Sequence, residues 1–348
     1  MRKTLSILQI AATYIGTVIG AGFASGLSIL QFFTSFGAYG TVGIAISTLL
    51  FMWIGMKMML LAHRIRAFSY QQFNTYLFGS FFGRLANMIS FGILFGVTAV
   101  MLSGAGSIAQ QQLGLSYQLG ILCSLVLIYL TMKRELGGVL AINSFVMPLM
   151  LCFTAIVAYY FGDPEALFAL SVWQREQAAG LSWLLHALAY AALNFVTLQA
   201  VLVPLGSEAK SESVIKWGAL WGGIGLGFML LVSHAAMQQL MPDILRYPIP
   251  MGEVIRHLAG WLHLLFVLVI YGEIFTTLIG NVFGMTRQLQ SVTKLPREPI
   301  VLGLLGLAYV LGQVGFEPLL ASLYTVFGYI GIWLVALLAI KRLPRPRE

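Results

Sequence analysis

Gly20-Ala21-Gly22-Phe23-Ala24-Ser25-Gly26 interrupts the first long apolar run of the chain, just past its middle. Glycine is a poor helix former, and the Gly-Ala-Gly step costs a helix about 2 kcal/mol relative to alanines. In hydrocarbon each unpaired backbone group costs several kcal/mol, so irregular backbone persists there only where it lines a protein cavity. The stretch therefore predicts an unwound segment at membrane depth. Close helix packing through glycines spaced four apart is the alternative.

The composition places this stretch in a membrane protein. The chain has 348 residues, of which 59% are hydrophobic and only 9% are charged. A soluble domain carries about 25% charged residues. The net charge of +8 could suggest nucleic acid as a partner, but the placement of the basic residues explains it better. The expected partners are the lipid bilayer and a small-molecule solute, with no nucleic acid.

Apolar runs long enough to cross a bilayer, about 20 residues each, recur along the whole chain. All Lys and Arg residues except Arg175, Arg246 and Arg256 fall on one side of these runs, which by the positive-inside rule is the cytoplasmic side. Both termini are then cytoplasmic in a multi-pass inner-membrane protein. The ten runs lie near residues 5–36, 41–62, 85–113, 117–132, 139–161, 182–204, 214–240, 258–286, 299–316 and 319–340.

The count of runs predicts an all-α integral membrane fold of one domain, residues 1–348, built as two halves. Residues 1–161 hold five runs, residues 162–181 form an outer connecting segment, and residues 182–341 hold five more. Because five is odd, the halves have opposite orientation in the membrane, which is an inverted repeat. A break in the first run then calls for a break in the sixth, where Asn194 is a poor helix former. Asn194 bonding a neighbouring helix is the alternative reading.

An acidic residue within the eighth run is the most informative single residue. Glu273 is followed by Thr276, Thr277, Gly280 and Asn281, which fall on one side of a helix. Intramembrane acids are costly and usually functional. A carboxylate with hydroxyls and carbonyls suits a hard cation such as Na⁺, and a buried carboxylate alone suits a proton. A structural partner for the acid is the alternative.

Few other motifs carry chemistry. The histidines have no metal-ligand spacing, and the chain has no phosphate-binding loop, nucleophile elbow or dinucleotide fingerprint, so we expect no enzyme and no cofactor besides a coupling ion. The proline-rich outer segment 241–257 is either an outer gate or a passive loop.

Four stretches resemble the bacterial YkvI-type membrane proteins, a family similar to the amino acid–polyamine–organocation superfamily. They lie at residues 15–26, at Phe78-Gly79 through Arg84, at residues 97–106 and at Tyr271 through Thr277. The resemblance implies a LeuT-like fold of five plus five helices in which helices 1 and 6 are broken. The chain departs from the family pattern at Leu27-Ser28 and Gln110-Gln111, where acidic residues are common.

The resemblance also implies two sets of site residues. The superfamily's second sodium site corresponds here to the carbonyls of Gly16, Ile19 and Glu273 and the hydroxyls of Thr276 and Thr277. Solute contacts correspond to the two breaks, with Gly20, Ala21, Gly22, Phe23, Ser25 and Gly26 in the first and Leu193, Asn194 and Thr197 in the second.

Together these patterns predict a secondary active transporter of a small polar solute, an amino acid or related amine, driven by Na⁺ or H⁺. A non-transporting membrane sensor or scaffold with the same fold is the main alternative. An ion channel fits less well, because the polar residues concentrate at one depth instead of lining a continuous path. The sequence leaves the solute, the coupling ion and the oligomeric state open.

Overall fold

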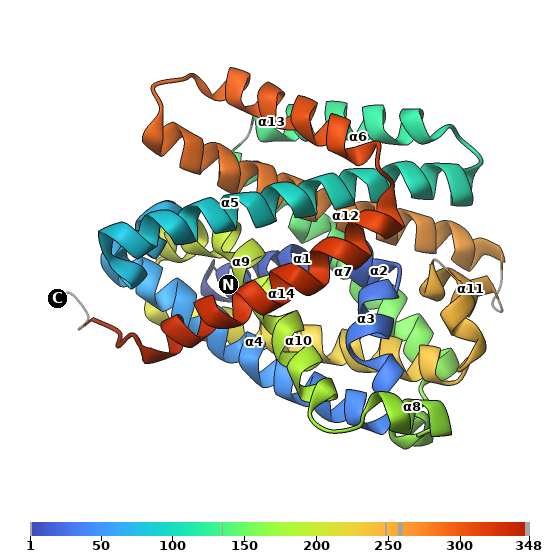
Figure 1. Ribbon diagram of the computed structural model, residues 1–348. Coiled ribbons are helices and arrows are strands. Elements are labelled where there is room, and N and C mark those ends of the chain that lie inside the picture. The colour runs from blue at the N-terminus through green and yellow to red at the C-terminus, as the bar shows by residue number, and fades with distance from the viewer. Residues whose placement is uncertain (1, 134, 248, 257–259, 345–348) are drawn as a thin grey trace.

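The computed structural model describes residues 2–133, 135–247, 249–256 and 260–344, and every regular element in this part of the chain is a helix (Figure 1). The first run gives α1 (Arg2–Val18), α2 (Ala21–Ala24) and α3 (Leu27–Phe32), followed by the short η1 (Thr34–Phe36). The remaining long helices are α4 (Ala38–Ile65), α5 (Tyr70–Leu113), α6 (Tyr117–Met132), α7 (Glu135–Phe161), α9 (Ser182–Glu208), α10 (Glu212–Gln238), α12 (Gly260–Val292), α13 (Arg297–Gly312) and α14 (Phe316–Ile340). Short helices η2 (Pro164–Phe168), α8 (Val172–Gln177), η3 (Asp243–Arg246) and α11 (Pro250–Arg256) occupy two of the connections.

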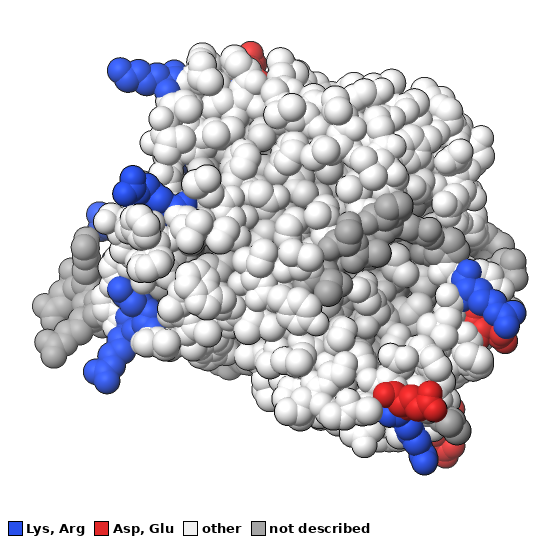
Figure 2. Space-filling view, viewed as in Figure 1, with Lys and Arg blue, Asp and Glu red and all other residues white. Residues whose placement is uncertain are grey.

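The surface of the molecule fits a bilayer. Six helices of the described residues are long and apolar enough to cross a membrane by length and composition: α4, α5, α9, α10 and parts of α7 and α12. Figure 2 shows a broad uncharged surface with Lys, Arg, Asp and Glu gathered at its two ends. Basic side chains predominate at the left end, where the C-terminus lies in Figure 1. This is the charge distribution that the positive-inside rule describes.

The first run is interrupted at Gly20 and at Gly26, but the predicted unwound stretch between them is helical at Ala21–Ala24. α1 ends at Val18 and α2 begins at Ala21, so Ile19 and Gly20 are not helical. A second change of direction follows at Gly26, which adopts φ +82° before α3 begins at Leu27. Glycine tolerates this left-handed backbone because it lacks a Cβ atom.

The prediction of a matching break in the sixth run is wrong. α9 runs without interruption from Ser182 to Glu208. The Asn194 amide nitrogen donates to the Tyr190 carbonyl oxygen four residues earlier, at 2.8 Å. The Thr197 hydroxyl likewise donates to the Asn194 carbonyl oxygen at 3.0 Å. Because no glycine or proline lies between residues 190 and 197, these side chains bond the backbone without opening the helix.

α9 is the centre of the bundle. In the most apolar stretch of 18 residues in this helix, 94% is buried inside the molecule. Small residues let its neighbours approach closely, as they do in other membrane bundles. A Cβ atom at Gly331 of α14 would lie 2.4 Å from the Ala192 carbonyl oxygen, and one at Gly206 of α9 would lie 2.6 Å from the Met59 carbonyl oxygen of α4. α4 and α14 therefore hold α9 in place. The interrupted first run packs against α9 through α1 and α3.

Candidate functional site

Backbone oxygens of the interrupted run meet two hydroxyls of α12. The Thr277 hydroxyl donates to the Ile19 carbonyl oxygen at 2.6 Å. The Thr276 hydroxyl donates to the Gly16 carbonyl oxygen at 2.9 Å and lies 2.9 Å from the Glu273 carbonyl oxygen. These contacts join segments more than 250 residues apart in the chain. The five oxygens predicted to form one cation site are therefore gathered in one place.

The carboxylate of Glu273 lies on the same helix, one turn before the two threonines. Its side chain is fully buried at 0% exposure, and neither carboxylate oxygen has a hydrogen-bond partner among the described residues. The structural partner considered as an alternative is therefore not found in that part of the chain. A buried acid without a partner is costly. Such a group is suited to hold a cation or a proton.

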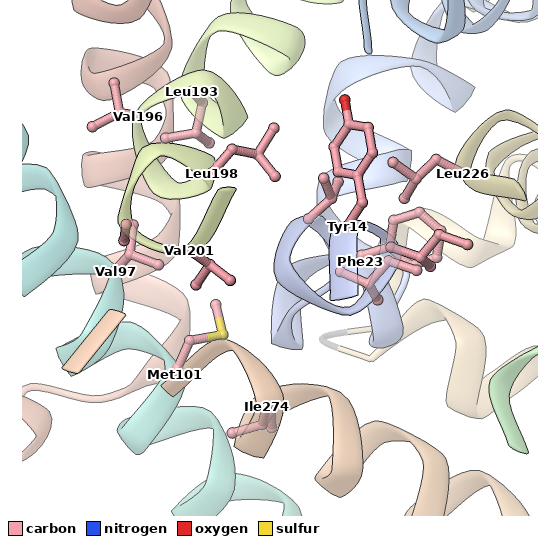
Figure 3. Packing of buried hydrophobic residues seen from close by; sticks show 14 of the residues in the cluster. Tyr14, Phe23, Val97, Met101, Leu193, Val196, Leu198, Val201, Leu226 and Ile274 are labelled. Carbon is pink, nitrogen blue, oxygen red and sulfur yellow. The ribbon is translucent and has the colours of Figure 1, made fainter. Parts of the chain in front are cut away.

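A small cavity of about 30 Å³ adjoins this cluster of oxygens. Gly20 and Phe23 border it from the interrupted run, and Thr277 borders it from α12. Figure 3 shows Val97 and Met101 projecting from α5 and Leu193 from α9 on the side opposite Phe23. The full lining consists of Thr17, Val18, Gly20, Phe23, Ser28, Val97, Met101, Tyr190, Leu193, Asn194, Thr197, Thr277 and Tyr324.

The chemistry of the lining limits what the cavity can hold. None of its residues is charged, while hydroxyls and the Asn194 amide supply polar groups. The described residues also contain no group of three or more His, Cys, Asp or Glu able to hold a metal ion. The chemistry of this lining suits a small polar solute without net charge. Because the cavity holds only about 30 Å³, its walls would have to move apart to admit one.

The predicted solute residues divide into two groups. Gly20, Phe23, Leu193, Asn194 and Thr197 line the cavity. The other predicted glycines and Ser25 do not. Gly22 instead packs against α14, where a Cβ atom would lie 3.1 Å from the Tyr324 ring. Ser25 closes a local turn, with its hydroxyl donating to the Gly22 carbonyl oxygen at 3.3 Å, and the side chain of Ala21 lies outside the described residues.

Gly26 belongs to a contact with the outer segment. The Met251 backbone N–H of α11 donates to the Ser25 carbonyl oxygen at 2.9 Å. A Cβ atom at Gly26 would lie 2.8 Å from Met251 Cγ and 2.9 Å from Met237 Sδ. The segment 241–257 thus packs directly on the interrupted run.

A polar cluster ties the connecting segment to the same end of the molecule. The Gln174 amide nitrogen donates to the Thr34 carbonyl oxygen at 2.9 Å and to Gln238 Oε1 at 3.0 Å. His234 is fully buried and hydrogen-bonds the Thr34 and Thr41 hydroxyls through its two ring nitrogens, at 3.0 and 3.1 Å. We call these five residues the outer cluster. It lies at the end of the molecule opposite the C-terminus, near α8 in Figure 1.

Sequence reasoning missed several walls of the cavity. Met101 of α5 and Tyr324 of α14 both line it, yet each stands in an apolar run where no pattern separates a cavity-facing side chain from a lipid-facing one. For Tyr190 the sequence offered a weak indication of a place in the cavity wall, because a hydroxyl near the middle of an apolar run needs a polar neighbour.

The chain was then compared with known proteins. No protein-family model matches it. It is 41% identical over 346 residues to the Bacillus subtilis protein described as the uncharacterized membrane protein YkvI, covering 99% of this chain and 98% of that protein. The chain belongs to the YkvI family. A second B. subtilis protein, the uncharacterized YyaD, is 25% identical over 324 residues, 93% of each chain.

The fold of this YkvI-family protein is that of the LeuT-like transporters. The structure of MhsT in complex with L-phenylalanine matches with a TM-score of 0.75 over 95% of this chain and 88% of that one, at 14% identity. A Na⁺-coupled sialic acid symporter matches with a TM-score of 0.68 over 95% and 78% of the two chains, at 11% identity. At these identities the likeness shows the fold of the YkvI-family protein alone.

Proposed function

We propose that this YkvI-family protein is a secondary active transporter that couples a cation gradient to the movement of a small polar solute. The observation that carries the proposal is the meeting of Thr276 and Thr277 with the Gly16 and Ile19 carbonyls. If α1 and α12 only packed against each other, without a ligand between them, irregular backbone at that depth would not be needed. Broken helices at the substrate and ion sites are a recurring feature of secondary transporters.

The solute in this proposal is an amino acid or a related amine. An amino acid zwitterion has no net charge, in keeping with a lining that offers hydroxyls and one amide but no ionised side chain. Phe23, Met101 and Leu193 supply apolar contact for a side chain.

The cation in this proposal is Na⁺ or H⁺. Five oxygens from Gly16, Ile19, Glu273, Thr276 and Thr277 form the kind of donor set that hard cations prefer, which favours Na⁺. The specific observation that favours H⁺ is the carboxylate of Glu273, whose two oxygens are buried and unpartnered. In both cases Glu273 supplies the negative charge that compensates the ion.

The proposal includes a membrane arrangement. Ten crossings with both termini in the cytoplasm would form one transport domain, with repeats at residues 1–161 and 182–341 joined by the outer segment 162–181. The outer cluster and α11 would then face away from the cytoplasm. The basic residues at the C-terminal end of the molecule support this orientation.

The test is solute flux in proteoliposomes, after a thermal-shift screen of amino acids and amines has identified a solute that binds. We expect uptake to require an imposed sodium or proton gradient. Glu273→Gln keeps the size of the side chain and should abolish accumulation driven by the gradient while solute exchange continues. Glu298→Gln makes the same chemical change at an exposed position of α13 and should behave like the unmodified protein.

The alternatives predict different results. Uptake indifferent to both gradients would exclude coupled transport. A sensor or scaffold would bind a solute without any flux, and it would tolerate Glu273→Gln.

A further inference from the structure

A basic groove lies on the outside of the bundle, far from the cavity. It runs between α4 and the end of α14 and has a volume of about 380 Å³. Lys57, Lys341 and Arg342 line it together with Trp53 and aliphatic side chains. We call this feature the basic groove. Its mixture of cations with apolar surface suits a ligand that carries both a negative charge and hydrocarbon.

The cations of the basic groove are held in place by uncharged groups. Lys57 Nζ donates to the Ala339 carbonyl oxygen at 3.0 Å and lies 5.0 Å from the centre of the Trp53 ring. Lys341 Nζ lies 4.8 Å from the centre of the Tyr76 ring. These contacts orient the ammonium groups and leave their charges uncompensated.

No carboxylate of the described residues lies within 4.0 Å of Lys57, Lys341 or Arg342. Glu212, an acid at this end of the molecule, already has a partner. Both oxygens of Glu212 accept from Arg64, at 2.7 and 3.0 Å. Arg64 in turn donates to the Pro344 carbonyl oxygen, which fixes the segment after α14 beside α4. As far as the structure describes the chain, the basic groove therefore carries an unbalanced positive charge.

The position of the basic groove favours an anionic lipid headgroup over an anion in solution. Lys57 stands eight residues before the end of α4, which places it about 12 Å inside the helix end. Trp53 is 37% exposed and Ile340 is 78% exposed, as expected for side chains at the boundary between headgroups and acyl chains. Basic pockets between membrane helices on the cytoplasmic side are the sites where anionic lipid headgroups bind.

We propose that the basic groove binds an anionic phospholipid of the inner leaflet. Its phosphate meets Lys57, Lys341 and Arg342, and its acyl chains lie along Trp53 and Ile340. The proposal shares its orientation with the proposed function but does not depend on transport, because a scaffold with this surface would bind the same lipid.

The test is a titration of the purified full chain, in an uncharged detergent, with dioctanoyl phosphatidylglycerol, and with dioctanoyl phosphatidylcholine or inorganic phosphate in parallel. The readout is the rise in melting temperature, checked by native mass spectrometry of the bound lipid. We expect phosphatidylglycerol alone to bind tightly, and its affinity to fall as salt is added.

The double variant Lys341→Gln/Arg342→Gln should weaken phosphatidylglycerol binding about 25-fold, since each basic residue near an anionic surface contributes about fivefold. Lys133→Gln is the matched control. Lys133 also lies 5.0 Å from a tyrosine ring, that of Tyr129, but in a groove that contains the acid Glu298. It should leave the affinity unchanged.

Three results would overturn the proposal. Equal binding of the two lipids would remove the role of charge, and equal protection by inorganic phosphate would show a site for a free anion. Equal weakening by Lys133→Gln would show a diffuse surface effect. The dependence on lipid charge and salt is measured on the unmodified protein, so the test stands even if the double variant does not fold.

Discussion

Replacing Thr277 by valine tests whether the five oxygens act as one cation site. Thr277 is 4% exposed, and its hydroxyl makes the 2.6 Å contact with the Ile19 carbonyl oxygen. Valine has nearly the same shape without the hydroxyl, so the change removes one oxygen of five and little volume. Loss of an ordinary hydrogen bond would cost the fold only about 0.5–1.5 kcal/mol.

The effect on the cation should be larger than the effect on the fold. A polar group that contacts a charge contributes about 1.5–3 kcal/mol, which corresponds to a cation affinity that is weaker by about 10- to 150-fold. The assay is solute uptake in proteoliposomes at fixed solute concentration, with the coupling cation varied. The concentration of cation for half-maximal uptake should rise by that factor, with a melting temperature close to that of the unmodified protein.

Thr286→Val is the matched control, because it makes the same change on the same helix. Thr286 is 1% exposed, and its hydroxyl has no hydrogen-bond partner among the described residues. It stands nine residues further along α12, about 13 Å away. If Thr277→Val leaves the half-maximal cation concentration within about twofold, or if Thr286→Val raises it equally, the reasoning is refuted.

Three further changes probe the architecture around the site. Gly26→Ala should lower the free energy of unfolding by more than the roughly 1–2 kcal/mol expected of left-handed backbone alone, because the added Cβ atom would meet Met251. Gly114 also has left-handed backbone, at φ +65°, but an added Cβ atom would meet nothing within 4 Å, so Gly114→Ala should show only the backbone cost. Equal shifts in melting temperature for the two variants would contradict this. Gly303 lies inside α13, and an added Cβ atom there would meet nothing within 4 Å. Gly303→Ala should therefore raise the free energy of unfolding by about 1 kcal/mol, and a lower melting temperature would contradict this. Gln174→Ala removes the hydrogen bonds of Gln174 to Gln238 and Thr34 and should speed hydrogen exchange in residues 162–181; unchanged exchange would show that the outer cluster does not hold the segment.

Much of the architecture could be predicted from local patterns. Apolar runs gave the helices, and the run near 117–132 coincides with α6. Gly79, which adopts φ 78° inside α5, separates a short first helix from the long one. The glycines of residues 20–26 marked the interruption, because glycine loses more backbone freedom in a helix than any other residue.

The rest depended on contacts between distant segments. Asn194 looked like a helix breaker by analogy between the two halves, but an amide that bonds its own preceding turn is compatible with a regular helix. Met101 and Tyr324 could not be assigned to the cavity, because burial against a solute and burial against lipid favour the same residue types. The meeting of Thr277 with Ile19 followed from the family resemblance, since the spacing within α12 predicts only which face those side chains share.

The outer cluster joins η1, α4, α8 and α10 through neutral hydrogen bonds. When such groups separate, incoming water replaces each lost partner, so the free energy per bond stays near 0.5–1.5 kcal/mol. An apolar plug would instead expose its surface to solvent at about 25 cal/mol for every Å². If the proposed transporter opens at this end, the contacts of the outer cluster could therefore separate and re-form at a small cost in free energy.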